Sequence, residues 1–132
     1  MKKFLLLIFV VAMTSCSAFK EKPKERINHL VFCWLKESGN KVQRAQLIKT
    51  SLDFKKIPGV LEVRAGEVVP SDRSIVDSSY DVAILLSFET EEDLNGYLVH
   101  KDHVDAVKTI LKPLTKKVLV YDFIEKFKTH QN

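Results

Sequence analysis

The stretch INHLVFCWL, residues 27–35, decides the fold because it is apolar without a break from residue 30 onward. A strand with one face in water normally alternates apolar and polar residues, whereas a strand buried on both faces does not. Residues 80–88 and 118–124 carry the same nearly continuous apolar pattern. The sequence therefore predicts three strands that need cover on both faces.

The segment between residues 36 and 79 predicts a helix followed by a fourth strand. Asn40 and Gln43 have the spacing of a capping box at the start of the helix. The residues expected on its buried face recur at helical spacing: Val42, Ala45, Ile48 and Leu52. Residues 60–69 alternate, which predicts a half-exposed strand with a bulge at Gly66.

A second helical region is predicted between residues 90 and 113. Thr90 is a typical N-cap residue, and three acidic residues follow it in the first turn. The order of elements is then strand, helix, strand, strand, helix, strand. The sequence thus predicts an α+β, ferredoxin-like βαββαβ fold, with a four-stranded antiparallel sheet and helices on one face.

The other face of this sheet needs a cover that the chain does not supply. Two helical regions shield one face, and the apolar face left over is larger than a monomer usually exposes. A second copy of the sheet, related by a two-fold axis, covers it most simply. We therefore expect a homodimer in which two sheets face one another as a dimeric α+β barrel, with a pocket between them.

The N-terminus carries the features of an export signal. Lys2 and Lys3 precede an apolar run over residues 4–13, and Cys16 follows shortly afterwards. Ten residues rise only about 15 Å as a helix, far short of the roughly 30 Å hydrocarbon core, so the run does not predict a membrane span. The end of the run resembles a bacterial lipobox, which implies lipidation of Cys16; ordinary cleavage nearby is the alternative.

We accordingly expect an exported protein of the cell envelope, held by the lipid on Cys16. Ser17 after this cysteine favours the outer membrane if the host has one. The expected divisions are a signal peptide (1–16), a tether (17–25), one domain (26–127) and a tail (128–132).

Charge and cysteine content exclude several classes of protein. The formal net charge is +4, and it falls to +2 without Lys2 and Lys3, so no nucleic-acid partner is expected. Besides Cys16 the chain contains only Cys33, which excludes a disulfide framework within one chain. Cys33 lies in an apolar run and is expected to be a buried, unreactive thiol.

Several short motifs together resemble the stress-responsive α/β-barrel (Dabb) family over residues 26–127. They are INHLVF (27–32), IPGV (57–60), YDVA (80–83), Phe88 and YLVHKDH (97–103). The Tyr-x-x-His-x-x-His run is the most specific of them. The resemblance implies the dimeric α+β barrel that the strand pattern also predicts.

The resemblance also implies a candidate site. One plant member of the family is a polyketide cyclase with a tyrosine and a histidine of this run as its acid/base pair; by motif position these are Tyr97 and His103. His29 matches a further histidine of that pocket. The chain departs from the pattern at Val82, where the cyclase has another pocket histidine, and at Lys101, where proline is usual.

Without the resemblance, the residue types leave three roles open for the run YLVHKDH (97–103). His100 and His103 have a spacing that allows shared metal coordination, but two histidines are too few, so no metal is expected. Tyr97 and His103 could instead perform acid/base chemistry without a cofactor. The structural alternative is that Tyr97, His100 and His103 fasten the helices to the sheet, with Asp102 as the N-cap of the second helical piece.

The sequence therefore leads to two hypotheses of function. The first is an exported, lipid-anchored homodimer that binds a small hydrophobic or aromatic molecule, or that serves in a stress response. His29, Tyr97, His100 and His103 are its expected ligand-binding residues. The second is a cofactor-independent cyclase, lyase or isomerase in which Tyr97, His103 and His29 are catalytic.

Overall fold

The computed structural model describes residues 25–126. The expected signal peptide, the tether up to residue 24, and the tail lie outside these residues. The elements are β1 (Arg26–Leu35), α1 (Lys41–Asp53), a 3₁₀ turn η1 (Phe54–Lys56), β2 (Val60–Glu67), β3 (Val82–Phe88), α2 (Glu91–Val99), α3 (Lys101–Ala106), a π-helical turn η2 (Val107–Leu111), α4 (Lys112–Leu114) and β4 (Thr115–Glu125). No helix within the described span has the length and apolar character needed to cross a membrane.

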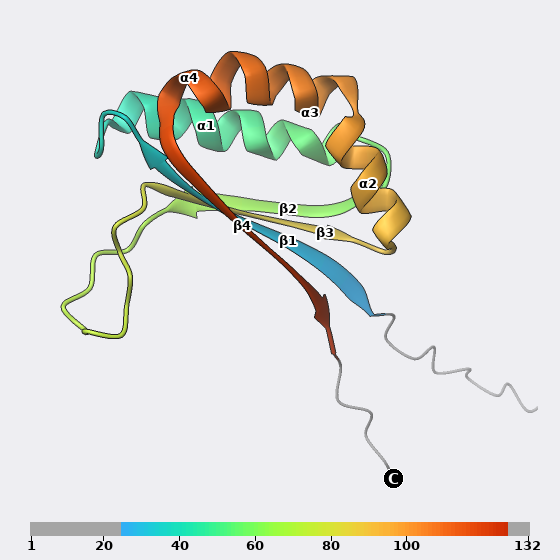
Figure 1. Ribbon diagram of the computed structural model, residues 1–132, viewed down its shortest axis with the longest axis horizontal. Helices are drawn as coiled ribbons and strands as arrows, with labels where there is room; N and C mark the ends of the chain where they lie inside the picture. Colours follow the sequence, from blue (N-terminus) through green and yellow to red (C-terminus); the bar gives the residue numbers. More distant parts are fainter. Residues whose placement is uncertain (1–24, 127–132) are drawn as a thin grey trace, which may run out of the picture.

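The four strands form one antiparallel sheet in the order β2-β3-β1-β4. All helices lie on one face of this sheet, with α1 alongside the α3–α4 segment (Figure 1). The predicted ferredoxin-like α+β fold is confirmed. Both predicted caps are present as well: the side chain of Asn40 accepts a hydrogen bond from the Gln43 N–H, and Thr90 accepts one from the Asp93 N–H.

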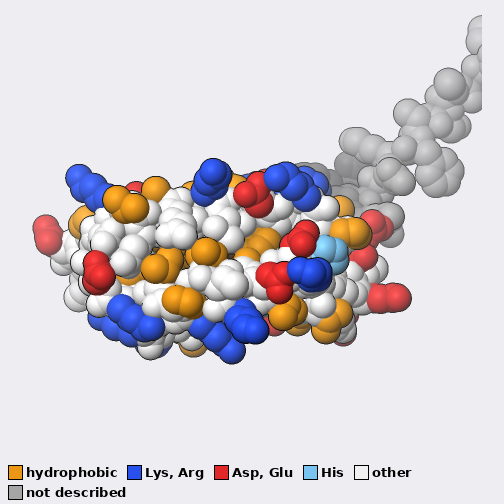
Figure 2. Space-filling view, turned by 90° about the horizontal axis from the view of Figure 1, so that it is seen from above, with side chains coloured by type: hydrophobic (Ala, Val, Ile, Leu, Met, Phe, Trp, Pro, Cys, Tyr) orange, Lys and Arg blue, Asp and Glu red, His pale blue; other side chains and the backbone are white. Residues whose placement is uncertain are grey.

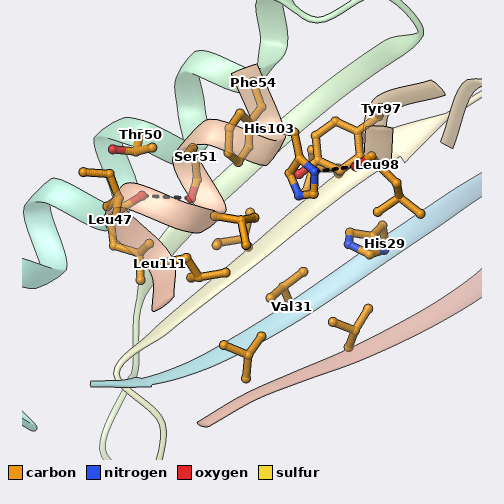
Figure 3. A pocket seen from close by; sticks show the side chains of 17 residues that line it. His29, Val31, Leu47, Thr50, Ser51, Phe54, Tyr97, Leu98, His103 and Leu111 are labelled. Atoms are coloured by element: carbon orange, nitrogen blue, oxygen red, sulfur yellow. Dashed lines mark hydrogen bonds between the residues drawn. The ribbon is translucent and has the colours of Figure 1, made fainter. Parts of the chain in front are cut away.

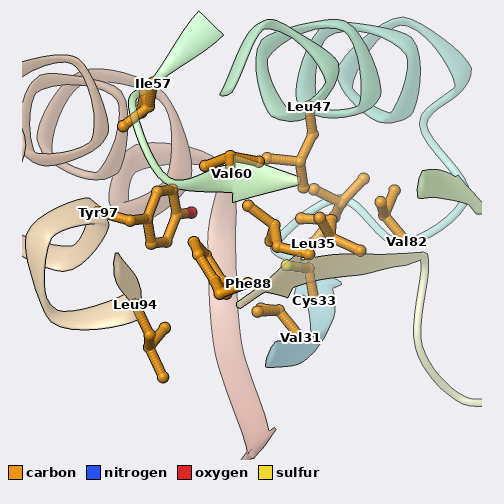
Figure 4. Close-up of a cluster of buried hydrophobic side chains, with 12 residues drawn as sticks. Val31, Cys33, Leu35, Leu47, Ile57, Val60, Val82, Phe88, Leu94 and Tyr97 are labelled. Carbon is orange, nitrogen blue, oxygen red and sulfur yellow. The ribbon is translucent and has the colours of Figure 1, made fainter. Parts of the chain in front are cut away.

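The hydrophobic core fills the space between the sheet and the helices (Figure 4). Its buried members are Val31, Cys33, Leu35, Leu47, Ile57, Val60, Val82, Ile84, Leu86, Phe88, Leu94 and Tyr97. Cys33 is completely buried there, and desolvation raises the pKa of its thiol to about 12. The expectation of a buried cysteine is confirmed, and a raised thiol pKa favours low reactivity.

The opposite face of the sheet is apolar and uncovered by any helix of residues 25–126. On this face Leu30 lies opposite Leu85 on β3 and Tyr121 on β4. Phe32, one pleat further along β1, lies opposite Leu119, and the Tyr121 side chain is 54% exposed. We call the surface formed by Leu30, Phe32, Leu85, Leu119, Tyr121 and Phe123 the open sheet face.

The prediction of the buried face of α1 was partly wrong. Val42 is 77% exposed and Leu52 is 46% exposed, whereas Leu47 and Ser51 are buried. The Ser51 hydroxyl donates a hydrogen bond to the Leu47 carbonyl, 2.8 Å away, so a serine fits the apolar interface. Arg44 also turns toward the sheet, where it pairs with a buried carboxylate. Apolar spacing alone therefore placed the inward face of the helix incorrectly.

That carboxylate belongs to Asp81, which is completely buried at the start of β3. It accepts hydrogen bonds from the N–H groups of Leu35 (2.9 Å) and Gly39 (2.7 Å) and from the Arg44 guanidinium (2.8 Å). Burial alone would raise the pKa of the Asp81 carboxyl, but these hydrogen bonds outweigh it and hold the pKa below its usual value. Asp81 thereby ties the end of β1, the following turn and α1 together.

The bulge in β2 lies at Leu61 and not at Gly66. The register with β3 shifts between Val60 and Glu62, while Gly66 pairs regularly with Ala83. The extra residue turns the Leu61 side chain to the surface, where it is 41% exposed, and keeps Val60 in the core.

Candidate functional site

A cavity of about 220 Å³ lies between the helices and the sheet (Figure 3). Its lining residues are His29, Val31, Leu47, Thr50, Ser51, Phe54, Ile84, Leu86, Tyr97, Leu98, His103, Ala106, Val107, Ile110, Leu111, Val118 and Val120. Most of these are apolar, and only three carry an imidazole or a phenol. An apolar cavity of about 150 Å³ is large enough for benzene, so this one has room for a small ring compound or a short chain.

The cavity differs in position from the pocket expected from the sequence. That pocket was placed between two facing sheets, whereas this cavity lies on the helical side of a single sheet. The edge of the cavity runs along β4, where Val118 and Val120 are partly exposed. Each copy of the chain therefore contains its own cavity.

Tyr97 reaches the cavity from α2, and its side chain is only 2% exposed. Its ring lies 4.3 Å from the His103 ring, 5.4 Å from Phe88 and 5.6 Å from Phe54, measured between centroids. Among the described residues its hydroxyl has no hydrogen-bond partner. Burial raises the pKa of this phenol, so Tyr97 stays protonated and can donate a hydrogen bond to a bound molecule.

His103 approaches from the first turn of α3. Its Nδ1 lies 3.0 Å from the Leu98 carbonyl oxygen. Because a carbonyl only accepts, Nδ1 carries the hydrogen, and Nε2 of the neutral ring keeps its lone pair. Burial lowers the pKa of His103 from its usual value, which favours the neutral imidazole that can act as a base.

His29 enters from β1 and is 6% exposed. Its Nδ1 lies 2.6 Å from Oδ1 of Asp122, which faces it across the β1–β4 ladder. A carboxylate that accepts a hydrogen bond from Nδ1–H fixes the orientation of the imidazole ring. Nε2 is then the ring nitrogen that this carboxylate does not contact. The His29 ring lies 6.1 Å from the Tyr97 ring, so the two histidines flank the tyrosine.

Asp122 is a site residue that the sequence analysis missed. The sequence contains one signal for this role: Asp122 is the single acidic residue in the otherwise apolar segment VLVYDFI of β4. The sequence does not give the register that places Asp122 opposite His29, because the two residues are 93 positions apart.

His100 does not join the other three residues. It ends α2 and serves as the N-cap of α3, with its Nδ1 accepting a hydrogen bond from the Asp102 N–H at 3.2 Å. The prediction of Asp102 as the N-cap was wrong: His100 has the extended backbone of a cap, and Asp102 lies in the first turn. The structure thus brings His29, Tyr97 and His103 together around the cavity, whereas His100 does not line it.

The structure also shows where Val82 and Lys101, the two departures from the family pattern, lie. Val82 is completely buried in the core and does not line the cavity, so the cavity contains two imidazoles, those of His29 and His103. Lys101 is exposed on α3 and pairs with Asp105 one turn later. Within residues 25–126 no group of three metal-ligating side chains occurs.

A four-stranded ferredoxin-like sheet with helices on one face and an apolar open face is the subunit architecture expected of a dimeric α+β barrel. The model of the stress-responsive A/B barrel domain (Dabb) matches residues 27–125, so the chain belongs to this family. No curated protein sequence matches the chain.

Solved structures show the same fold. A Dabb family protein from Mesorhizobium loti is 20% identical with a TM-score of 0.64, covering 78% of this chain and 99% of its own. A hydroxynitrile lyase from Passiflora edulis is 19% identical with a TM-score of 0.68, over 81% and 99%. A dimeric ferredoxin-like protein of unknown function from Thermobifida fusca is 20% identical with a TM-score of 0.61, over 76% and 92%.

Proposed function

We propose that the chain is a homodimer in which each subunit binds a small hydrophobic or aromatic molecule in the cavity under its helices. The proposal rests on one observation: the cavity is mainly apolar, and the polar side chains of His29, Tyr97 and His103 line it together. Apolar walls with a few placed polar groups are typical of small-molecule sites. The open sheet face and the dimeric neighbour support the assembly, and the family's name suggests a role in stress response.

A cavity-filling substitution tests the binding site. Ala106→Phe places a ring in the cavity from α3, so we expect it to weaken binding of octanamide, a neutral eight-carbon probe, by about tenfold or more because no room remains. Binding is measured by NMR titration of the labelled protein. The matched control is Ala45→Phe, at an exposed position on α1. Equal affinities of the two variants would contradict the proposal.

A second candidate function is cofactor-independent acid/base catalysis in the same cavity. The specific observation is that His103 keeps a free Nε2 lone pair beside the protonated hydroxyl of Tyr97. Nε2 can take a proton from a hydroxyl, or from a carbon next to a carbonyl, while Tyr97 donates a hydrogen bond to the carbonyl oxygen. The hydroxynitrile lyase neighbour supports testing hydrophobic hydroxynitriles first, where loss of the hydroxyl proton expels cyanide and leaves a carbonyl.

Replacement of the two polar groups tests this candidate. Tyr97→Phe and His103→Gln should each lower turnover by about 100-fold or more, with the fold kept. Because burial lowers the pKa of His103, wild-type turnover should persist below pH 6.5 and then fall as the imidazole becomes protonated. Rates are measured as carbonyl release over pH 4 to 8. Unchanged turnover in either variant removes that residue from the mechanism.

We further propose export and lipid anchoring through Cys16, which lies outside the described residues. The support is the order of Lys2 and Lys3, the apolar run and the cysteine. In a bacterium that processes lipoproteins, Cys16→Ser should move the protein from the membrane fraction to the soluble fraction, because the lipid is its only proposed anchor. Continued membrane association of the variant would count against lipidation.

A further inference from the structure

A surface groove adjoins the cavity along the α3–η2 segment. Its lining residues are Leu98, His103, Val104, Val107, Lys108 and Lys112. Leu98, His103 and Val107 line the cavity as well, so these three side chains form a wall that the groove and the cavity share. A molecule that extends from the cavity into the groove therefore passes these side chains.

The groove is cationic at its far end. Lys108 and Lys112 are exposed, lie about one turn apart and form no ion pair within residues 25–126. The ammonium of Lys36 donates hydrogen bonds to the carbonyls of Lys112 (3.4 Å) and Pro113 (2.7 Å), which fixes a third positive charge nearby. No acidic residue among those that the structure describes lines the groove.

The surface around the groove carries charges of both signs. Seen from above the helices, Lys and Arg side chains lie along both long edges of the helical layer, with hydrophobic side chains between them and Asp and Glu side chains interspersed (Figure 2). On α3 the acidic Asp105 pairs with Lys101, at the opposite end of the segment from Lys112. Asp105 is thereby engaged with Lys101, and Lys108 and Lys112 form no ion pair in the described part of the chain.

We propose that the cavity ligand is a single-chain amphiphile with an anionic headgroup of the carboxylate type. Its headgroup lies between Lys108 and Lys112, and its apolar end enters the cavity toward Tyr97 and His103. This inference rests on the proposed binding function and names the class of ligand.

The distance from His103 to the two lysines and the volume of the cavity limit the size of the ligand. Lys108 and Lys112 follow His103 by five and nine residues, which corresponds to about 7 to 14 Å along a helix. A chain of about eight carbons spans this distance. The 220 Å³ cavity has no room for the two acyl chains of a phospholipid, so the ligand has a single chain.

Octanoate and octanamide form a matched pair of probes, because they have the same number of heavy atoms and differ in charge. We expect the protein without residues 1–16 to bind octanoate about fivefold more tightly than octanamide in low salt, by NMR titration. The double variant K108Q/K112Q should lose this preference and keep its affinity for octanamide. High salt should also reduce the preference.

A charge-matched control separates the groove from net charge. K41Q/K49Q removes two exposed lysines of α1 that line neither the groove nor the cavity, and it should keep the preference for octanoate. Equal affinities of the two probes in the wild type, or the same loss in both double variants, would overturn the inference and leave the binding function intact. Failure of both probes to bind would overturn the binding function together with the inference.

Discussion

Asp81→Asn is expected to lower the free energy of unfolding by about 3 to 5 kcal/mol, the usual cost of breaking a buried ion pair from one side. Both carboxylate oxygens of Asp81 accept hydrogen bonds, one from Leu35 and the other from Gly39 and Arg44. An asparagine NH₂ group cannot accept, so at least one of these buried donors loses its partner. Urea unfolding at pH 7 measures the effect.

The pH dependence gives this prediction a specific signature. The folded state holds the pKa of Asp81 below its usual value, so its contribution to stability is present above about pH 4 and is lost as the pH falls through the folded value. The difference between the wild type and Asp81→Asn should therefore shrink at acid pH. Asp72→Asn, in the exposed loop after β2, is the control. An effect as small as that of the control at pH 7 would contradict the structural role of Asp81.

Leu85→Lys is expected to raise the dissociation constant of the proposed dimer by about 100-fold or more. Leu85 lies on the central strand β3 in the open sheet face, opposite Leu30. Two-fold symmetry would bury two lysines without partners in the interface, and burial of an unpaired charge is costly. Sedimentation equilibrium of the protein without residues 1–16 measures the shift from dimer to monomer.

Val42→Lys is the matched control for this substitution. Val42 is also an apolar residue at the surface, but it lies on α1, on the opposite side of the sheet. We expect this variant to remain a dimer. Dissociation caused equally by both substitutions would show that the interface does not lie on the open sheet face.

Most of the fold could be predicted because its signals are local. Continuous apolar runs mark strands buried on both faces, and Asn40 and Thr90 mark the helix starts through contacts three residues away. The inward face of α1 could not be predicted in the same way. It depends on the contact between Arg44 and Asp81, which are 37 positions apart and meet only after the sheet has formed.

The candidate site was predictable to a similar extent. Tyr97 and His103 belong to one short motif, and the structure brings their rings together. On a continuous helix Tyr97 and His100 would share a face. The extended backbone of His100 breaks the helix, and this removes it from the cavity. The pairing of His29 with Asp122 depends on strand register, which the sequence does not specify.

A native mass spectrum of the protein without residues 1–16, recorded at micromolar concentration with added octanoate, tests the account most directly. We predict a species of twice the subunit mass that binds up to two octanoate molecules, because each subunit contains its own cavity. A species of single-subunit mass, or a dimer that binds only one molecule, would contradict the assembly and the position of the site.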